Sequence, residues 1–91
     1  MTVADAMREK LTRAFHPTAL AVIDESHLHA GHAGAREGGE SHFRVEIVSD
    51  TFAGLSRVAR HRRVHDVLAE ELRGGVHALA VTARTPDEAT R

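Results

Sequence analysis

The chain has no cysteine, no tryptophan and no tyrosine, and its 91 residues include only two prolines and three phenylalanines. Without cysteine the chain forms no disulfide. It also provides no thiolate to a metal ion or cluster, so any such ligand has to come from another molecule. The small number of aromatic rings leaves little surface on which nucleic-acid bases could stack.

Long apolar runs and an excess of one charge are missing as well. No segment reaches the roughly 18 apolar residues that cross a bilayer, and MTVADAMREKLTRAF lacks the apolar centre of a secretory signal. Twelve basic and thirteen acidic residues give a net charge of −1, which attracts neither nucleic acid nor a membrane as a whole. We expect a soluble cytoplasmic protein with no membrane partner, folded as one domain over residues 1–91.

Histidine is plentiful instead, with eight residues in all. His27, His29 and His32 crowd one glycine-rich stretch, and His77 follows two glycines far downstream. Neutral imidazole is a borderline-soft metal ligand, so a loop histidine and a fixed histidine could close on one metal if the fold brings them together. The spacing of the triplet matches no closed zinc pattern. The alternatives are an exposed loop for the triplet and a histidine at the edge of the core for His77.

Apolar spacing and helix-cap residues predict the secondary structure. The expected elements are a helix over 3–15, a strand over 19–26, a loop over 27–41, a strand from 42 to about 49, a capped turn at 49–52, a helix from about 57 to 72 behind a serine cap, a strand over 76–83 and a short helix from 85. This order, α-β-β-α-β-(α), predicts an α/β (α+β) fold in which helices cover one face of a mixed three-stranded sheet and the first two strands are antiparallel.

The helix expected from residue 57 has an unusual order of charges. Its first half carries arginines and its second half acids, namely Arg57, Arg60, Arg62 and Arg63 against Asp66, Glu70 and Glu71. This order opposes the helix dipole, which favours acids at the start. It indicates an anion or nucleic-acid contact, or else a solvated face with an ion pair between Arg62 and Asp66. The segment Gly54-Leu55-Ser56-Arg57 has only the first glycine of a GXXG nucleic-acid loop.

No arrangement of residues points to an enzyme. The chain has no phosphate-binding glycine motif and no paired general acid and base. Asp24, Ser26 and His27 are close in sequence, but alternate strand residues point to opposite faces, so these three do not form a catalytic triad.

Four segments resemble the BolA family over nearly the whole chain: DESHLHAGH, SHFRVEIVSDTFAGLS, RHRRVHDVLAEEL and VHALAVTARTP. The resemblance implies a class II KH-like fold and a heterodimer with a monothiol glutaredoxin around a shared [2Fe-2S] cluster, completed by glutathione. It also implies that His77, at the start of the last strand, is one cluster ligand and that the loop histidine His29 is the other. His27 and His32 are less favoured candidates for the same position.

The resulting hypothesis is an adaptor for iron–sulfur cluster trafficking or iron sensing. Two histidines on one iron are known from Rieske centres, and this chain can supply both but no sulfur. The alternative hypothesis is a DNA-binding transcriptional regulator that uses Arg57, Arg60, Arg62 and Arg63.

Overall fold

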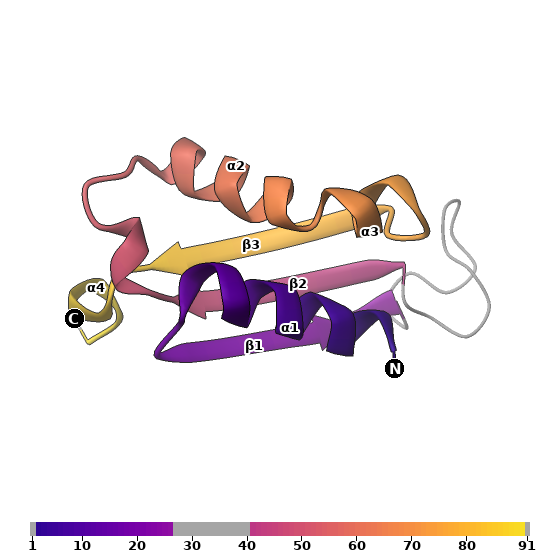
Figure 1. The fold of residues 1–91 in the computed structure, drawn as a ribbon, viewed down its shortest axis with the longest axis horizontal. Coiled ribbons are helices and arrows are strands. Elements are labelled where there is room, and N and C mark those ends of the chain that lie inside the picture. Colours follow the sequence, from indigo (N-terminus) through magenta and orange to yellow (C-terminus); the bar gives the residue numbers. More distant parts are fainter. Residues whose placement is uncertain (1, 27–40, 91) are drawn as a thin grey trace.

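The computed structural model describes residues 2–26 and 41–90, which form an α+β fold in the predicted order of elements (Figure 1). These elements are α1 (Val3–Phe15), β1 (Ala19–Asp24), β2 (His42–Val48), the 3-10 helix η2 (Asp50–Phe52), α2 (Arg57–Val67), α3 (Ala69–Arg73), β3 (Ala78–Arg84) and α4 (Pro86–Ala89). The predicted ligands His27, His29 and His32 lie outside the described residues. Within the described ranges, no helix combines the length and the apolar character that a membrane span requires.

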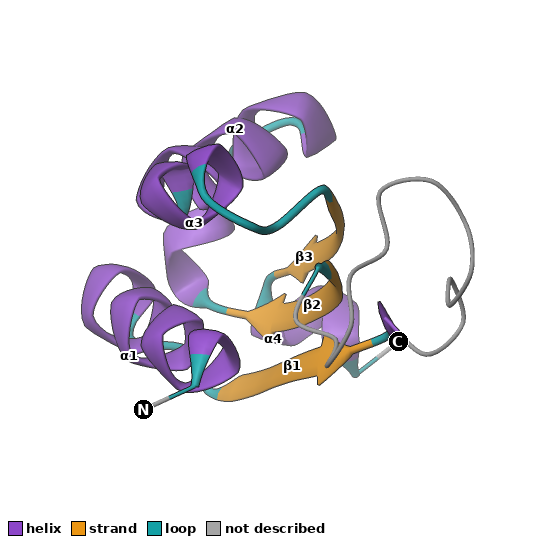
Figure 2. Ribbon diagram, turned by 90° about the vertical axis from the view of Figure 1, so that its right-hand side faces the viewer, coloured by secondary structure: helices purple, strands orange, loops and turns teal. Residues whose placement is uncertain are grey.

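The three strands form one mixed sheet in the order β1-β2-β3. Strand β2 is antiparallel to β1 and parallel to β3, and Val45 is the register partner of both Val22 and Val81. Figure 2 shows α1, α2 and α3 together on one face of the sheet. The predicted mixed sheet with helices on one face is therefore confirmed.

The core lies between this face of the sheet and the helices. Alternate residues of β2 are buried, as the apolar alternation in the sequence predicts. Phe15 of α1 meets Phe52 of η2 with ring centroids 5.1 Å apart. The buried apolar residues are Met7, Leu11, Phe15, Val22, Phe43, Val45, Ile47, Phe52, Val64, Leu68 and Val76.

Side-chain caps decide where three of the helices begin. Thr2 and Asp5 form a reciprocal capping box at the start of α1. Ser56 Oγ accepts a hydrogen bond from the backbone N–H of Ala59 at 3.1 Å, which confirms the predicted serine cap of α2. Thr85 and Glu88 form a second capping box, and it confirms the predicted start of α4.

The single helix expected over 57–72 is wrong in one respect, because the structure divides it into α2 and α3 at Leu68. Leu68 is fully buried and leaves helical geometry, and its N–H is shared between the carbonyl groups of Val64 and Asp66. Periodic apolar residues predict that both halves face the core, which they do. The pattern does not distinguish one continuous helix from two helices that meet at a buried residue.

The expected strand over 76–83 begins two residues too early. Val76 is buried and donates its N–H to the carbonyl of Glu71 at 3.2 Å, so it closes the end of α3 and does not pair in the sheet. His77 therefore lies immediately before β3, not within it, and it is exposed.

The strand expected over 19–26 is too long by two residues. The side chain of Asp24 accepts the N–H of Ser26 at 2.9 Å, which turns the chain after Asp24.

Candidate functional site

Strands β2 and β3 are parallel, so both begin at the same end of the sheet. His77 immediately precedes β3 and therefore lies at this end. Figure 1 shows this end of the molecule opposite α4. The backbone N–H groups of His77 and Ala78 both donate to the carbonyl of Ser41, at 2.7 and 3.3 Å. The main chain of His77 is thus held in place while its imidazole is exposed to solvent.

A second histidine, His42, lies next to His77. The two ring centroids are 6.4 Å apart, with an angle of 48° between the ring planes. His42 is the first residue of β2 and is half-buried. His42 is not among the ligands predicted from the sequence, so sequence reasoning missed it as a possible ligand. The signal that could have revealed it is the parallel pairing of two strands that start at residues 42 and 78.

Buried serines hold this end of the sheet together. Ser26 Oγ accepts the backbone N–H groups of Ser41 and His42, at 2.9 and 3.2 Å. Ser41 Oγ lies 3.3 Å from Ser26 Oγ and 2.9 Å from Nδ1 of His42. Ser26 is 5% exposed and Ser41 is 0% exposed. The serines therefore join the chain just before residue 27 to the chain just after residue 40, and they orient the ring of His42.

The described residues around this end offer imidazoles but no complete metal site. Across residues 2–26 and 41–90, no group of three or more His, Cys, Asp or Glu side chains is placed to hold a metal ion. The nearby Arg44 forms an ion pair with Glu25, with 3.1 Å between Nε and Oε2, so its positive charge is compensated. This end can provide neutral nitrogen ligands to a metal whose other ligands come from elsewhere.

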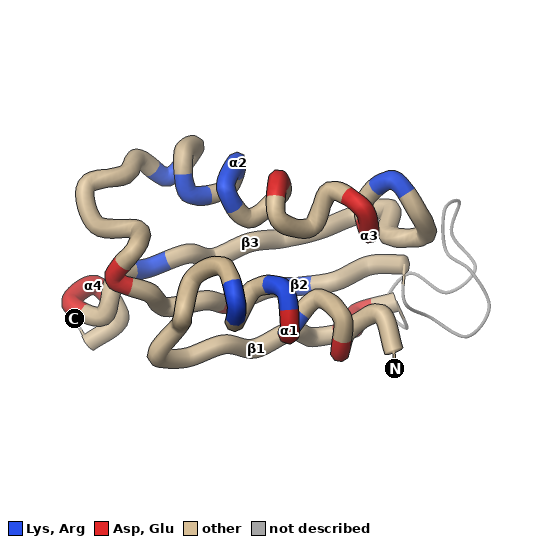
Figure 3. Tube along the Cα trace, viewed as in Figure 1, with Lys and Arg blue, Asp and Glu red and all other residues tan. Residues whose placement is uncertain are grey.

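The second candidate site is the arginine-rich half of α2. Figure 3 shows Lys and Arg on the first half of α2, and Asp and Glu from its second half into α3. A pocket of about 590 Å³ opens between this half of the helix and β3. Its lining consists of Leu55, Arg57, Arg60, His61, Val81, Thr82, Ala83, Arg84 and Glu88.

Arg60 is engaged within the fold. Its side chain is 12% exposed, and its guanidinium donates to the carbonyl groups of Leu55 and Ala83 and to both carboxylate oxygens of Glu88. Glu88 also accepts the backbone N–H of Thr85. The hydrogen bonds from Arg60 and then from Thr85 lower the pKa of Glu88 to about 2, and the bond to Glu88 raises the pKa of Arg60. The geometry gives Arg60 a structural role.

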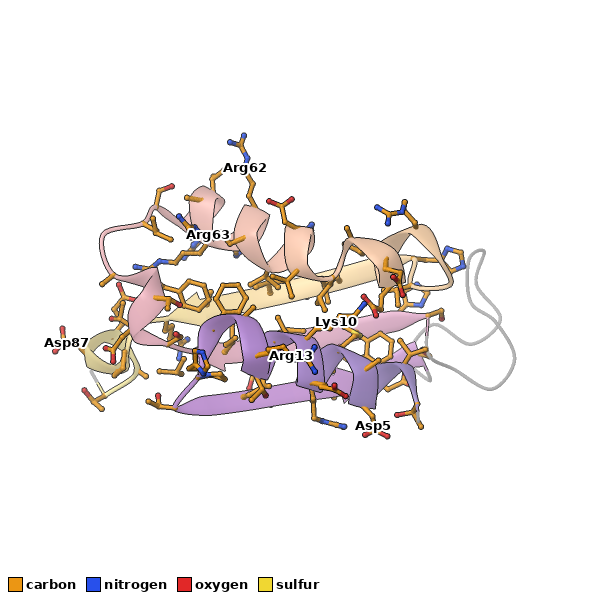
Figure 4. All side chains as sticks on the ribbon, in the orientation of Figure 1. Asp5, Lys10, Arg13, Arg62, Arg63 and Asp87 are labelled. Carbon is orange, nitrogen blue, oxygen red and sulfur yellow. The ribbon has the colours of Figure 1, made fainter. Side chains whose placement is uncertain are left out.

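The other three candidate arginines, Arg57, Arg62 and Arg63, are exposed. In the part of the chain that the structure describes, none of them forms an ion pair, and the pair between Arg62 and Asp66, one of the two alternatives from the sequence, is not formed. Figure 4 shows Arg62 directed away from the sheet. Any anion that contacts α2 would meet these three residues before Arg60.

Residues 11–88 match the family of BolA-like proteins. The chain belongs to this family. An uncharacterised protein in the cobS 5' region of Sinorhizobium sp is 54% identical over 92 residues, covering 100% of this chain and 99% of the relative. The DNA-binding transcriptional regulator BolA of Vibrio cholerae is 45% identical over 86 residues, covering 94% of this chain and 77% of the relative.

Solved structures agree with the family assignment. BolA1 from Arabidopsis thaliana superposes with a TM-score of 0.87 at 47% identity, covering 97% of this chain and 96% of that structure. The chain spans 23%, 54% and 59% of the full lengths of three plant and mammalian relatives. Both the fold and the family resemblance expected from the sequence are thereby confirmed.

Proposed function

We propose that this BolA-like chain is a non-catalytic cytoplasmic adaptor that binds a monothiol glutaredoxin and shares a bridging [2Fe-2S] cluster with it. The main support is the position of His77, an exposed imidazole whose backbone is held at the end of the sheet by Ser41. The role of the pair would be iron–sulfur cluster trafficking or iron sensing.

The donor set of the chain fits a shared cluster better than a cluster of its own. Clusters are held chiefly by thiolates, and this chain contains none. His77 would supply one nitrogen ligand, and His29 is the proposed loop ligand, with His27 and His32 as alternatives. The partner's cysteine and the thiol of glutathione would complete the four ligands.

The test is to purify this chain together with a monothiol glutaredoxin and to measure visible absorption and circular dichroism. We expect a brown heterodimer that contains iron, sulfide and glutathione, and no stable cluster on this chain alone. The matched control is His65→Ala, which removes an exposed imidazole from α2 and should leave the spectrum unchanged. A cluster that survives gel filtration on the isolated chain, or the absence of a complex, would contradict the proposal.

A second candidate function is DNA binding through Arg57, Arg62 and Arg63. Two observations favour it. The three arginines are exposed and Arg57 lines the open pocket, and one relative is named as a DNA-binding transcriptional regulator. Each phosphate contact contributes about one unit to the slope of affinity against salt concentration. Replacing the three arginines by glutamine while retaining Arg60 should reduce both the affinity for a duplex and this slope. If the parent chain binds no duplex at low salt, DNA binding is excluded.

A further inference from the structure

The two histidines at the end of the sheet point to a metal site that requires no partner protein. We propose that His42 and His77 together bind one Cu²⁺, Ni²⁺ or Zn²⁺ ion on the free chain. This inference does not depend on the glutaredoxin complex. It needs only the two side chains and the backbone that joins them.

The distance between the rings suits one shared ion. A metal–nitrogen bond of about 2.0–2.1 Å places the centroids of two imidazoles on one ion roughly 5–6 Å apart. The observed separation is 6.4 Å. Because His77 is exposed, its side chain can change rotamer on a fast timescale and close the remaining gap.

The backbone maintains this distance. His42 and Ala78 are register partners in the parallel pair of β2 and β3. Ser41, immediately before His42, accepts the N–H groups of His77 and Ala78. The Cα atoms that carry the two rings are therefore fixed relative to each other, and binding a metal would order only side-chain torsions.

Ser41 Oγ lies 2.9 Å from Nδ1 of His42, in the place where metal-bound histidines usually have an outer-shell partner. Ligand histidines usually donate their second ring N–H to an outer-shell group, and this bond fixes the tautomer. When Ser41 donates its hydroxyl hydrogen to Ser26, its Oγ can accept Nδ1–H of His42 across the observed 2.9 Å. In that tautomer the lone pair of the ring lies on Nε2, which is the nitrogen we assign to the metal.

The ligand type selects the class of metal. Imidazole suits Cu²⁺, Ni²⁺ and Zn²⁺, whereas Mg²⁺ and Ca²⁺ prefer oxygen ligands. The described residues add no third ligand, so the remaining coordination positions would hold water or groups from another molecule. Affinity should be highest for Cu²⁺ in the usual order of divalent metals.

The experiment titrates Cu²⁺ alone into a chain in which His27, His29 and His32 are all replaced by alanine. In this background we expect one Cu²⁺ per chain and an electron paramagnetic resonance spectrum with coupling to two nitrogens. His42→Ala and His77→Ala should each weaken binding by at least the roughly tenfold that outer-shell changes alone produce. Mg²⁺ should not compete.

The matched control is His65→Ala. His61 and His65 are four residues apart on α2, so they face the same side of the helix and form the competing two-histidine site. We expect His65→Ala to leave Cu²⁺ affinity unchanged. Loss of binding in this variant, or in only one of the His42 and His77 variants, would overturn the assignment, and so would a background chain that binds no Cu²⁺.

A conservative variant separates ligation from folding. His42→Gln retains a polar side chain beside Ser41 but lacks the imidazole, and far-UV circular dichroism and thermal melting report whether it is folded. The proposal would also be overturned if a folded His42→Gln chain bound Cu²⁺ with the same affinity as the chain that lacks only His27, His29 and His32. Failure here would leave the glutaredoxin proposal intact, because that complex is tested with iron and with the partner present.

Discussion

The two ends of the parallel pair β2 and β3 are stabilised in different ways. At the end where the strands begin, Ser26 and Ser41 bind backbone groups, and the main-chain N–H of His77 is held by Ser41. At the end where α4 packs, the side chain of Arg60 is itself the support, because it binds Glu88 and two carbonyl groups. Figure 1 shows that these ends are far apart.

This difference separates candidate ligands from structural residues. A side chain that uses four of its five N–H donors inside the fold, such as Arg60, has little capacity for a partner. A side chain that the backbone positions without using its polar atoms, such as His77, keeps that capacity. Residue type alone does not distinguish the two cases.

The largest expected effect comes from substituting one residue at each end of the sheet, His77 or Arg60, and measuring the glutaredoxin complex. His77→Ala should abolish the visible circular dichroism of the cluster and leave the melting temperature nearly unchanged, because the side chain is exposed. Arg60→Met should do the reverse, lowering the melting temperature while the cluster spectrum persists. If both variants lose the cluster to the same extent, the contrast between the two ends is not functional.

The next effect concerns the buried serines. Ser26→Ala leaves the backbone N–H groups of Ser41 and His42 without their acceptor, so it should reduce the free energy of unfolding by about 1–3 kcal/mol. Urea denaturation measures the change. Ser49→Ala is the matched control at the opposite end of β2, where Ser49 Oγ donates to the carbonyl of Phe15. A Ser26→Ala chain as stable as the parent would show that water replaces the serine.

A smaller effect should appear in how the stability of the chain changes as the pH falls. Bonds from Arg60 and Thr85 hold the pKa of Glu88 at about 2, below the ordinary value of 4.5. The stabilisation from ionised Glu88 is therefore complete above about pH 4.5 and is lost as the pH falls toward 2. Glu88→Gln should be less stable than the parent at neutral pH and should approach it in acid.

Thermal melts at a series of pH values between 7 and 2 test this expectation, with the exposed Glu46→Gln as the control. If Glu88→Gln and the parent lose stability in parallel over the whole range, Glu88 is not the group that titrates.

The smallest effect is expected on α2. Arg62 is exposed and forms no ion pair with any described residue, so Arg62→Gln should change the free energy of unfolding by less than about 0.5 kcal/mol. A clear destabilisation would show that the arginines of α2 support the fold, which would weaken the case for DNA contact.

Local patterns in the chain were enough for most of the fold. The alternation of apolar residues around Val45 predicts a half-buried strand, and the serine cap at Ser56 predicts the start of a helix. Such signals involve residues a few positions apart, so they are readable in the sequence. The four segments that resemble the BolA family predicted the family and the fold that the comparisons confirm.

The candidate site depended on contacts between residues far apart in the chain. The parallel pairing of β2 with β3 places His42 beside His77, and packing of α4 turns Arg60 from a predicted nucleic-acid contact into the partner of Glu88. The sequence alone determined which chemical groups are present: imidazoles, arginines and no thiolate. Tertiary structure decided which of them meet and which remain exposed, because strand register and helix packing act across the whole chain.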